Sequence, residues 1–117
     1  MSTNNKIEFS TSLPLQLEKL KRTLLPTEGL IWTDILVLCT LDHLQKELVL
    51  IEIKDIVREL GMNRVWVYQS INRLHKKDLI QVTPRHQTSS FVSLNGWGKL
   101  LLFKVEDYIN GHEPYTS

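Results

Sequence analysis

The stretch that decides the fold runs from Leu60 to Ile80 and reads LGMNRVWVYQSINRLHKKDLI. Gly61 indicates the end of a helix, because glycine readily adopts the left-handed conformation that closes many helices. Asn63 is a good N-cap for the next helix, which we predict from Arg64 to about Lys77. Two helices joined by only three residues have no room to stack antiparallel, so they must cross steeply. The stretch therefore predicts a helix-turn-helix.

The second of these helices has a core face and an outward face. At about 100° per residue, Val67, Ile71 and Leu74 fall within roughly 60° of one another, so we predict that they point into the core. Arg, Gln and Asn on the opposite face suit the DNA major groove, where they form paired hydrogen bonds with base edges. A plain solvated helix face is the alternative, and the pattern alone leaves it open. The outward and flanking positions are Arg64, Val65, Trp66, Tyr68, Gln69, Asn72, Arg73 and Lys76.

The rest of the chain predicts a small, mainly helical α+β domain around this motif. Residues 1–12 are polar and predicted to be disordered, residues 13–110 to form one domain, and residues 111–117 to be a tail. Before the motif we predict a helix over 13–24 ended by Pro26 to Gly29, and a central helix that is capped by Thr33 and runs to about His43. A short strand over 48–53 and a helix over 53–60 follow. After the motif we predict a hairpin of strands over 80–84 and 90–94, and a last helix that is capped by Asn95 and runs from Gly96 to about Asn110.

Positive charge is concentrated on the predicted helix-turn-helix and hairpin. The chain carries 14 Lys and Arg against 13 Asp and Glu, a net charge of +1. Residues 58–86 hold six basic and two acidic residues, a net of +4, which leaves eight basic and eleven acidic residues elsewhere, a net of −3. A local excess of this kind is sufficient to neutralise DNA phosphates. Arg85 and His86 lie at the predicted hairpin tip, where they are expected to contact the DNA backbone or minor groove.

The same residues carry a resemblance to a known family. Leu60–Ile80 resembles the turn and recognition helix of bacterial winged helix-turn-helix regulators, and VSLNGWGKLLL (92–102) is similar to the strand-to-helix junction of the MarR-like families. The central WTDILVLCTL (32–41) also sits where those families place their central helix. The resemblance covers about residues 33–110. It implies a winged helix-turn-helix with flanking terminal helices.

The resemblance also implies a function. The chain would be a sequence-specific transcriptional regulator on double-stranded DNA, with the recognition helix in the major groove and the wing on the backbone or minor groove. By position, the polar cap of the family turn matches Asn63, exposed recognition positions match Arg64, Tyr68 and Gln69, and the basic wing tip matches Arg85.

This sequence departs from the family pattern in three places. Trp66 stands where a small residue is usual, the wing has a single Arg, and one C-terminal helix follows where a further long helix is common. The size is closer to the compact SarA-like or PadR-like relatives.

Apolar stripes on both predicted terminal helices indicate a homodimer. A two-fold dimer places two recognition helices about 34 Å apart, one turn of DNA. The alternative is that these helices only cover the winged domain. The predicted dimerisation residues are Leu13, Leu17, Leu20, Leu24, Leu101, Val105 and Tyr108.

Enzymatic, metal-binding and membrane functions find no support in the sequence. Cys39 and His43 are one helical turn apart, but they lie in the most apolar helix, where we expect an inert buried cysteine. His75, His86, His112 and Glu113 have no metal-site spacing, and no glycine-rich phosphate loop occurs. The longest apolar stretch, residues 30–41, is shorter than the roughly 20 residues of a membrane span. A single cysteine favours a reducing compartment, so we predict a cytoplasmic protein without enzymatic activity, cofactor or metal.

Two other functions remain open for the same fold. Val65, Trp66 and Tyr68, if exposed together, would suit a winged helix that docks another protein, because aromatic side chains anchor protein interfaces. A plasmid or phage replication or maintenance factor would use the fold on DNA. Salt dependence distinguishes protein docking from DNA binding, since binding through phosphates weakens steeply as salt rises and apolar docking does not.

Overall fold

The computed structural model describes Leu15, residues 17–84 and residues 90–110. These residues group into two compact units: Trp32–Leu102 forms the larger, and the residues up to Ile31 and from Phe103 onward form the smaller. Several predictions concern residues outside the described ranges: the disordered segment 1–12, the tail 111–117, and the roles of Leu13, Arg85 and His86. These stay predictions, and so do the predicted domain boundaries.

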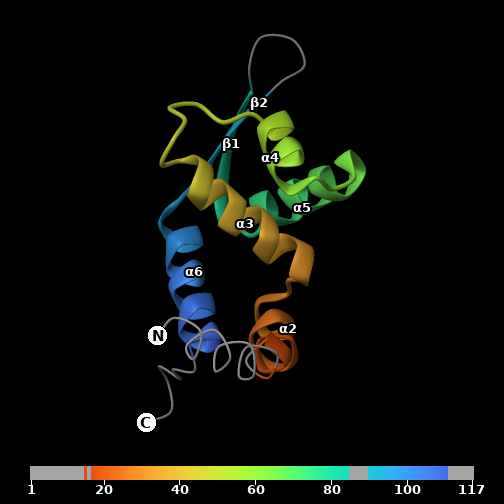
Figure 1. The fold of residues 1–117 in the computed structure, drawn as a ribbon, viewed down its shortest axis with the longest axis vertical. Coiled ribbons are helices and arrows are strands. Elements are labelled where there is room, and N and C mark those ends of the chain that lie inside the picture. The colour runs from red at the N-terminus through yellow and green to blue at the C-terminus, as the bar shows by residue number, and fades with distance from the viewer. Residues whose placement is uncertain (1–14, 16, 85–89, 111–117) are drawn as a thin grey trace, which may run out of the picture. The chain divides into compact units, whose positions relative to one another are not determined.

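Helix α3 (Trp32–Leu44) lies at the centre of the larger unit (Figure 1). It packs against α4 (Ile53–Leu60), α5 (Arg64–Lys76) and strand β2 (Ser90–Leu94). The helix begins one residue before the predicted cap Thr33. The expectation that Cys39 is buried is wrong, because Cys39 falls on an exposed side of α3 that it shares with His43.

The predicted strand over 48–53 does not form. Of these residues, Glu52 forms a single β-bridge with Phe91, and the backbone N–H of Val92 donates to the carbonyl of Ile51 at 2.8 Å. Further along β2, the N–H of Leu94 donates to the side-chain Oε1 of Gln45, also at 2.8 Å. A side-chain amide thus satisfies the edge of β2 where a third strand would continue.

Helix α4 begins and ends at the residues that the sequence predicts. Its N-cap is Glu52, whose backbone N–H donates to the Asp55 carboxylate at 2.9 Å. Gly61 closes the helix with φ of 65°, the left-handed conformation that favours glycine. The cap is a Glu paired with an acid three residues on, which is why no Ser, Thr, Asp or Asn stands at this position.

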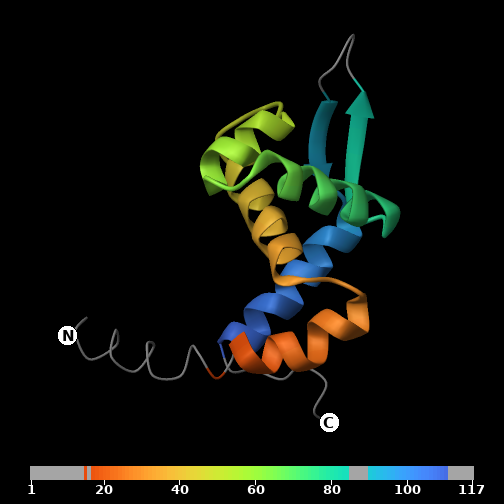
Figure 2. The ribbon, with the colours of Figure 1, turned by 90° about the vertical axis from the view of Figure 1, so that its right-hand side faces the viewer.

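The predicted hairpin is confirmed. Strands β1 (Ile80–Pro84) and β2 pair antiparallel, with Ile80 opposite Leu94 and Pro84 opposite Ser90. The two strands rise side by side from the end of α5 and the beginning of α6 (Gly96–Ile109), as Figure 2 shows. The predicted cap of the last helix is also confirmed, because Asn95 Oδ1 accepts the N–H of Gly98 at 2.9 Å.

The smaller unit is helical in its described N-terminal part. A π-helical turn, η1 (Leu20–Leu24), leads directly into α2 (Leu25–Glu28), which ends at Gly29 with φ of 70°. Pro26 does not end the helix as predicted, because it lies in the first turn of α2, where a missing N–H is tolerated. The Lys104 ammonium lies 3.5 Å from the Glu28 carboxylate within this unit.

Among the described helices, none is long and apolar enough to cross a membrane alone, and one broken pair, Leu17–Glu28 with Trp32–Leu44, reaches that length and composition together.

Candidate nucleic-acid interface

Helix α5 is held by its packing against α3, α4 and β1. The predicted core residues are confirmed, since Val67, Ile71 and Leu74 are all buried, and Ser70 is buried with them. Asn63 caps the helix as predicted, its Oδ1 accepting the N–H of Val65 at 2.7 Å. One side of α5 is therefore fixed to the core, and the other side is left to solvent.

The side opposite the core carries a row of exposed residues that we name the outer stripe: Val65, Gln69, Asn72 and Lys76. At about 100° per residue these four positions lie within roughly 60° of one another. Gln69, Asn72 and Lys76, together with Arg73, line a shallow open depression. Arg64, Trp66 and Tyr68 lie exposed on the flanks, with Trp66 57% exposed. The stripe presents amide, ammonium and apolar groups to anything that lies along α5.

The sequence predicts that Arg73 points outward with the other polar residues of α5. The structure contradicts this prediction. Its Nε donates to Oδ2 of Asp34 at 2.8 Å and its Nη2 donates to Oδ1 at 2.9 Å. Asp34 belongs to α3 and is 0% exposed, whereas the Arg73 side chain is 34% exposed. The guanidinium is thus turned toward α3, and the outward placement of Arg73 is corrected.

The ion pair with Asp34 affects the pKa of Arg73 and provides the buried acid with a charged partner. The hydrogen bond to Asp34 raises the pKa of Arg73, and the attraction of the carboxylate adds to that effect, while desolvation opposes it. A buried carboxylate needs a charged or hydrogen-bonding partner. The signal for such a partner is in the sequence, where Asp34 interrupts the most apolar helix.

Other basic residues around α5 stay available for an anionic partner. Arg64, Lys76 and Lys77 are exposed, and they form no ion pair with any residue that the structure describes. Arg58 of α4, in contrast, lies 3.4 Å from the Asp55 carboxylate. The available positive charge is therefore gathered at the two ends of α5.

The predicted dimerisation stripe is buried within the single chain. Leu20, Leu24, Leu101 and Val105 are all buried. Leu17 and Tyr108 are partly buried, so neither offers a free apolar surface. The exposed apolar side chains of α6 are instead Trp97, Leu100 and Phe103.

The described residues include no group of three or more His, Cys, Asp or Glu side chains placed to hold a metal ion. His43 Nε2 lies 3.8 Å from the carboxylate of Glu47 on the same exposed side of the helix end. Cys39 is exposed one turn earlier. Both side chains are thus open to solvent.

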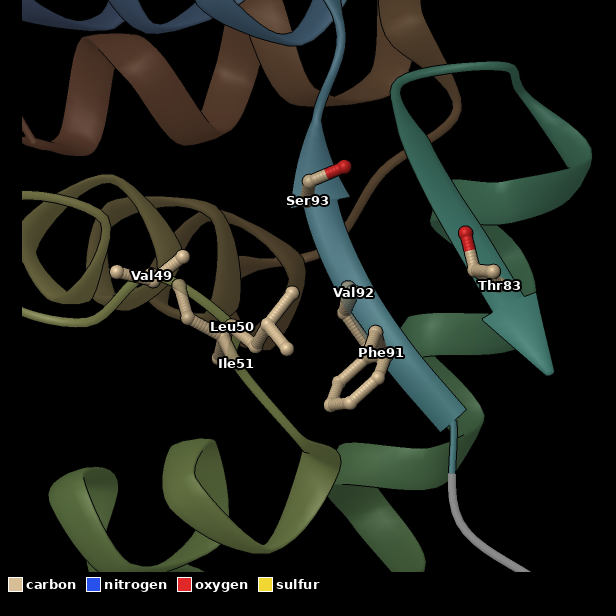
Figure 3. Close-up of a pocket in the computed structure, with 7 residues that line it drawn as sticks. All are labelled: Val49, Leu50, Ile51, Thr83, Phe91, Val92 and Ser93. Carbon is tan, nitrogen blue, oxygen red and sulfur yellow. The ribbon is translucent and has the colours of Figure 1, made fainter. Parts of the chain in front are cut away.

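A second hollow lies between β2 and the segment 49–51 (Figure 3). Its volume is about 190 Å³, below the roughly 300–1,000 Å³ of typical small-molecule sites. None of its lining residues is ionisable, so it has no group that would orient a charged ligand. They are Val49, Leu50, Ile51, Thr83, Phe91, Val92 and Ser93.

Comparison with solved structures identifies the fold. A MarR-family transcriptional regulator from Rhodococcus sp. RHA1 superposes with a TM-score of 0.65 over 95% of this chain and 76% of its own, at 14% sequence identity. AbsC, a MarR-family regulator from Streptomyces coelicolor, gives a TM-score of 0.61 over 94% and 72%, at 18% identity. The fold is the MarR-type winged helix.

A third winged helix of this type was solved on its target. A mutant of MarR from E. coli, in complex with operator DNA, superposes with a TM-score of 0.56 over 95% of this chain and 86% of its own, at 14% identity. No protein-family model matches the sequence, and no curated protein sequence matches it either. At such identities the likeness concerns the fold, which the sequence predicts.

Proposed function

We propose that this chain is a sequence-specific transcriptional regulator that binds double-stranded DNA through α5. The observation that carries the proposal is the exposure of Gln69 and Asn72 on the outer stripe of a helix whose other side is fixed to the core. Both amides match base edges in the major groove, which admits one α-helix. The operator complex of E. coli MarR, which shares the fold, supports the same partner.

Each exposed residue of the interface then has a role. Arg64, Gln69 and Asn72 contact base edges, and Tyr68 and Lys76 contact the phosphate backbone, because the N-terminal residues of a recognition helix lie deepest in the groove. Trp66 either stacks at the edge of the duplex or braces the wing. Val65 packs against a base, and Asn63 positions the helix start. The wing residues, Arg85 and His86, contact the backbone or minor groove.

Truncating a base-reading side chain is expected to weaken DNA binding without unfolding the protein. Arg64→Ala and Gln69→Ala should each lower affinity for DNA from upstream of the chain's own gene by about fivefold or more, because a good bidentate base contact is worth about 1–3 kcal/mol. Mobility shifts at two salt concentrations measure the effect. Only Arg64→Ala should alter the salt slope if that residue also neutralises a phosphate.

Lys99→Ala is the matched control, because Lys99 is an exposed cation on α6 rather than on α5. Its affinity should equal that of the parent. Equal affinity of all three variants and the parent would refute the placement of the interface on α5.

A docking site for another protein is the second candidate function. Val65, Trp66 and Tyr68 are exposed together around the first turn and a half of α5. An apolar anchor of this kind would bind with little dependence on salt, whereas contacts with several phosphates weaken steeply as salt rises. The free cations Arg64 and Lys76 at either end of α5 favour DNA.

A homodimer completes the proposal, with the exposed face of α6 as its interface. Trp97, Leu100 and Phe103 recur every three residues and are exposed, and exposed apolar patches commonly mark association sites. The mass in solution should be twice the 13.6 kDa of the chain. Leu100→Asp should shift it toward the monomer, and Lys46→Asp, an exposed lysine outside α6, should not. A parent protein that stays monomeric at high concentration would contradict the dimer.

As a regulator of this kind the chain is a DNA-binding protein rather than an enzyme, and it acts in the cytoplasm.

A further inference from the structure

The ion pair between α3 and α5 withholds a guanidinium from the outer stripe. Asp34 is fully buried, so its carboxylate cannot follow Arg73 toward solvent. Two charge-assisted hydrogen bonds of 2.8 and 2.9 Å hold the planar guanidinium against α3, and Nη2 lies 3.4 Å from Ser70 Oγ as well. A bidentate pair of this kind fixes orientation as well as distance. Nε and Nη2 are thus committed to Asp34 and Ser70, which leaves only Nη1 beside the depression that Arg73 lines, and Nη1 lacks the second nitrogen that a paired contact with guanine uses.

Withholding Arg73 changes which base pairs the outer stripe matches. Arg and Lys pair with guanine O6 and N7, Gln and Asn pair with adenine N6 and N7, and apolar side chains contact the thymine methyl group. The first two turns of the stripe carry Val65, Gln69 and Asn72. Lys76 is the last residue of α5, about 16 Å along the axis from Val65, so it lies near the backbone rather than the bases.

We propose that Asp34 determines the base preference of α5: by holding Arg73 against α3, it leaves an outer stripe complementary to A·T base pairs. Guanine contacts are then confined to the position opposite Arg64, in the first turn. The inference rests on the proposed DNA binding. Asp34 itself touches no base, so it acts as a positioning residue, through Arg73.

Selection from a library of duplexes with a randomised central region tests the inference. The wild-type protein should enrich sites with consecutive A·T pairs and at most one G·C pair in each half-site. Asp34→Asn keeps the shape of the side chain and removes its charge. It should therefore release Arg73, enrich guanine about fivefold or more at one additional position, and steepen the salt slope for non-specific DNA.

The double variant Asp34→Asn/Arg73→Met isolates the contribution of Arg73. It lacks both charges of the ion pair, and it should select the same sites as the wild-type protein with the same salt slope. Circular dichroism confirms that each variant is folded. If Asp34→Asn does not fold, the double variant alone tests the inference. If Arg73 contacts a base in the wild-type protein, the double variant loses that contact and selects different sites.

Three results would overturn the inference. They are wild-type selection of G·C-rich half-sites, loss of a guanine preference in the double variant, and an unchanged preference in a folded Asp34→Asn protein. In each of these the protein still binds DNA, so the proposed function survives. Failure of the wild-type protein to bind any duplex would refute the proposed function and the inference together.

Discussion

Replacing Arg73 by Met alone is expected to lower the free energy of unfolding by about 3–5 kcal/mol, because it leaves a buried carboxylate without its guanidinium partner. Asp34 is 0% exposed and accepts both hydrogen bonds from Arg73. The Arg73 side chain is 34% exposed, so water can reach part of the gap, and the loss should fall toward the lower end of that range. Urea denaturation followed by circular dichroism measures it.

Two control variants show whether the loss comes from removing the guanidinium charge beside Asp34. Asp34→Asn/Arg73→Met should recover most of the stability, since removing both members of a buried pair is often close to neutral. Lys76→Met, an exposed position of the same helix, should change the free energy of unfolding by less than about 0.5 kcal/mol. If Arg73→Met is as stable as the parent, the pair contributes nothing to the fold.

The pH dependence of this contribution follows from the direction of the shift. The pKa of Arg73 is raised by Asp34, so on the alkaline side the stability that it provides is kept up to the unfolded pKa of arginine and is lost as the pH rises through the folded pKa. Both values lie far above neutrality. Measured stability should therefore show no transition from Arg73 between about pH 6 and 9, a range in which arginine stays charged.

The helix-turn-helix and the hairpin could be predicted from sequence because their signals are local. Gly61 and Asn63 act on the backbone within a few residues, through a left-handed φ and a side-chain cap. The strands over 80–84 and 90–94 pair with each other across a short connection, so their register needs no distant partner. The core face of α5 follows from helical periodicity, which depends on geometry alone.

The orientation of Arg73 could not be predicted in the same way. Helical periodicity gives the direction in which a side chain leaves the backbone, and Arg73 lies on the flank of the outward face. Its long side chain is then drawn to a carboxylate 39 residues earlier in the chain. In a long, flexible side chain the charged group need not lie in the direction in which the Cβ points. For Arg73 the contact with Asp34 determines where the guanidinium lies, and helical periodicity does not contain that contact.

The way in which the apolar residues of the terminal helices and of residues 48–53 are covered could not be predicted for a related reason. An apolar stripe shows that a surface must be covered, but not whether the same chain covers it, and Leu101 and Val105 prove to be buried within the chain. A β-branched run forms a strand only where a free edge lies beside it. Gln45 occupies that edge at Leu94, and Val49 is left 99% exposed.

The junction between β2 and α6 gives the second large effect. Gly98 is buried against the backbone of Leu79, and a Cβ at this position would collide with the Leu79 carbonyl oxygen and come within 3.0 Å of Leu94 Cδ2. The same carbonyl accepts the N–H of Asn95 at 3.3 Å, so it is tied to the junction and cannot move away freely. Gly98→Ala should therefore lower the free energy of unfolding by about 1–3 kcal/mol, the usual cost of overpacking.

Gly96→Ala is the matched control for this substitution. It changes the same residue type two positions earlier in α6, where an added Cβ would meet nothing within 4 Å. Alanine has a higher helix propensity than glycine by up to about 1 kcal/mol, so this variant should be as stable as the parent or slightly more so. Thermal unfolding of the two variants side by side measures the difference. Equal melting temperatures would mean that β2 and α6 do not approach each other closely at Gly98, and the close strand-to-helix junction would have to be abandoned.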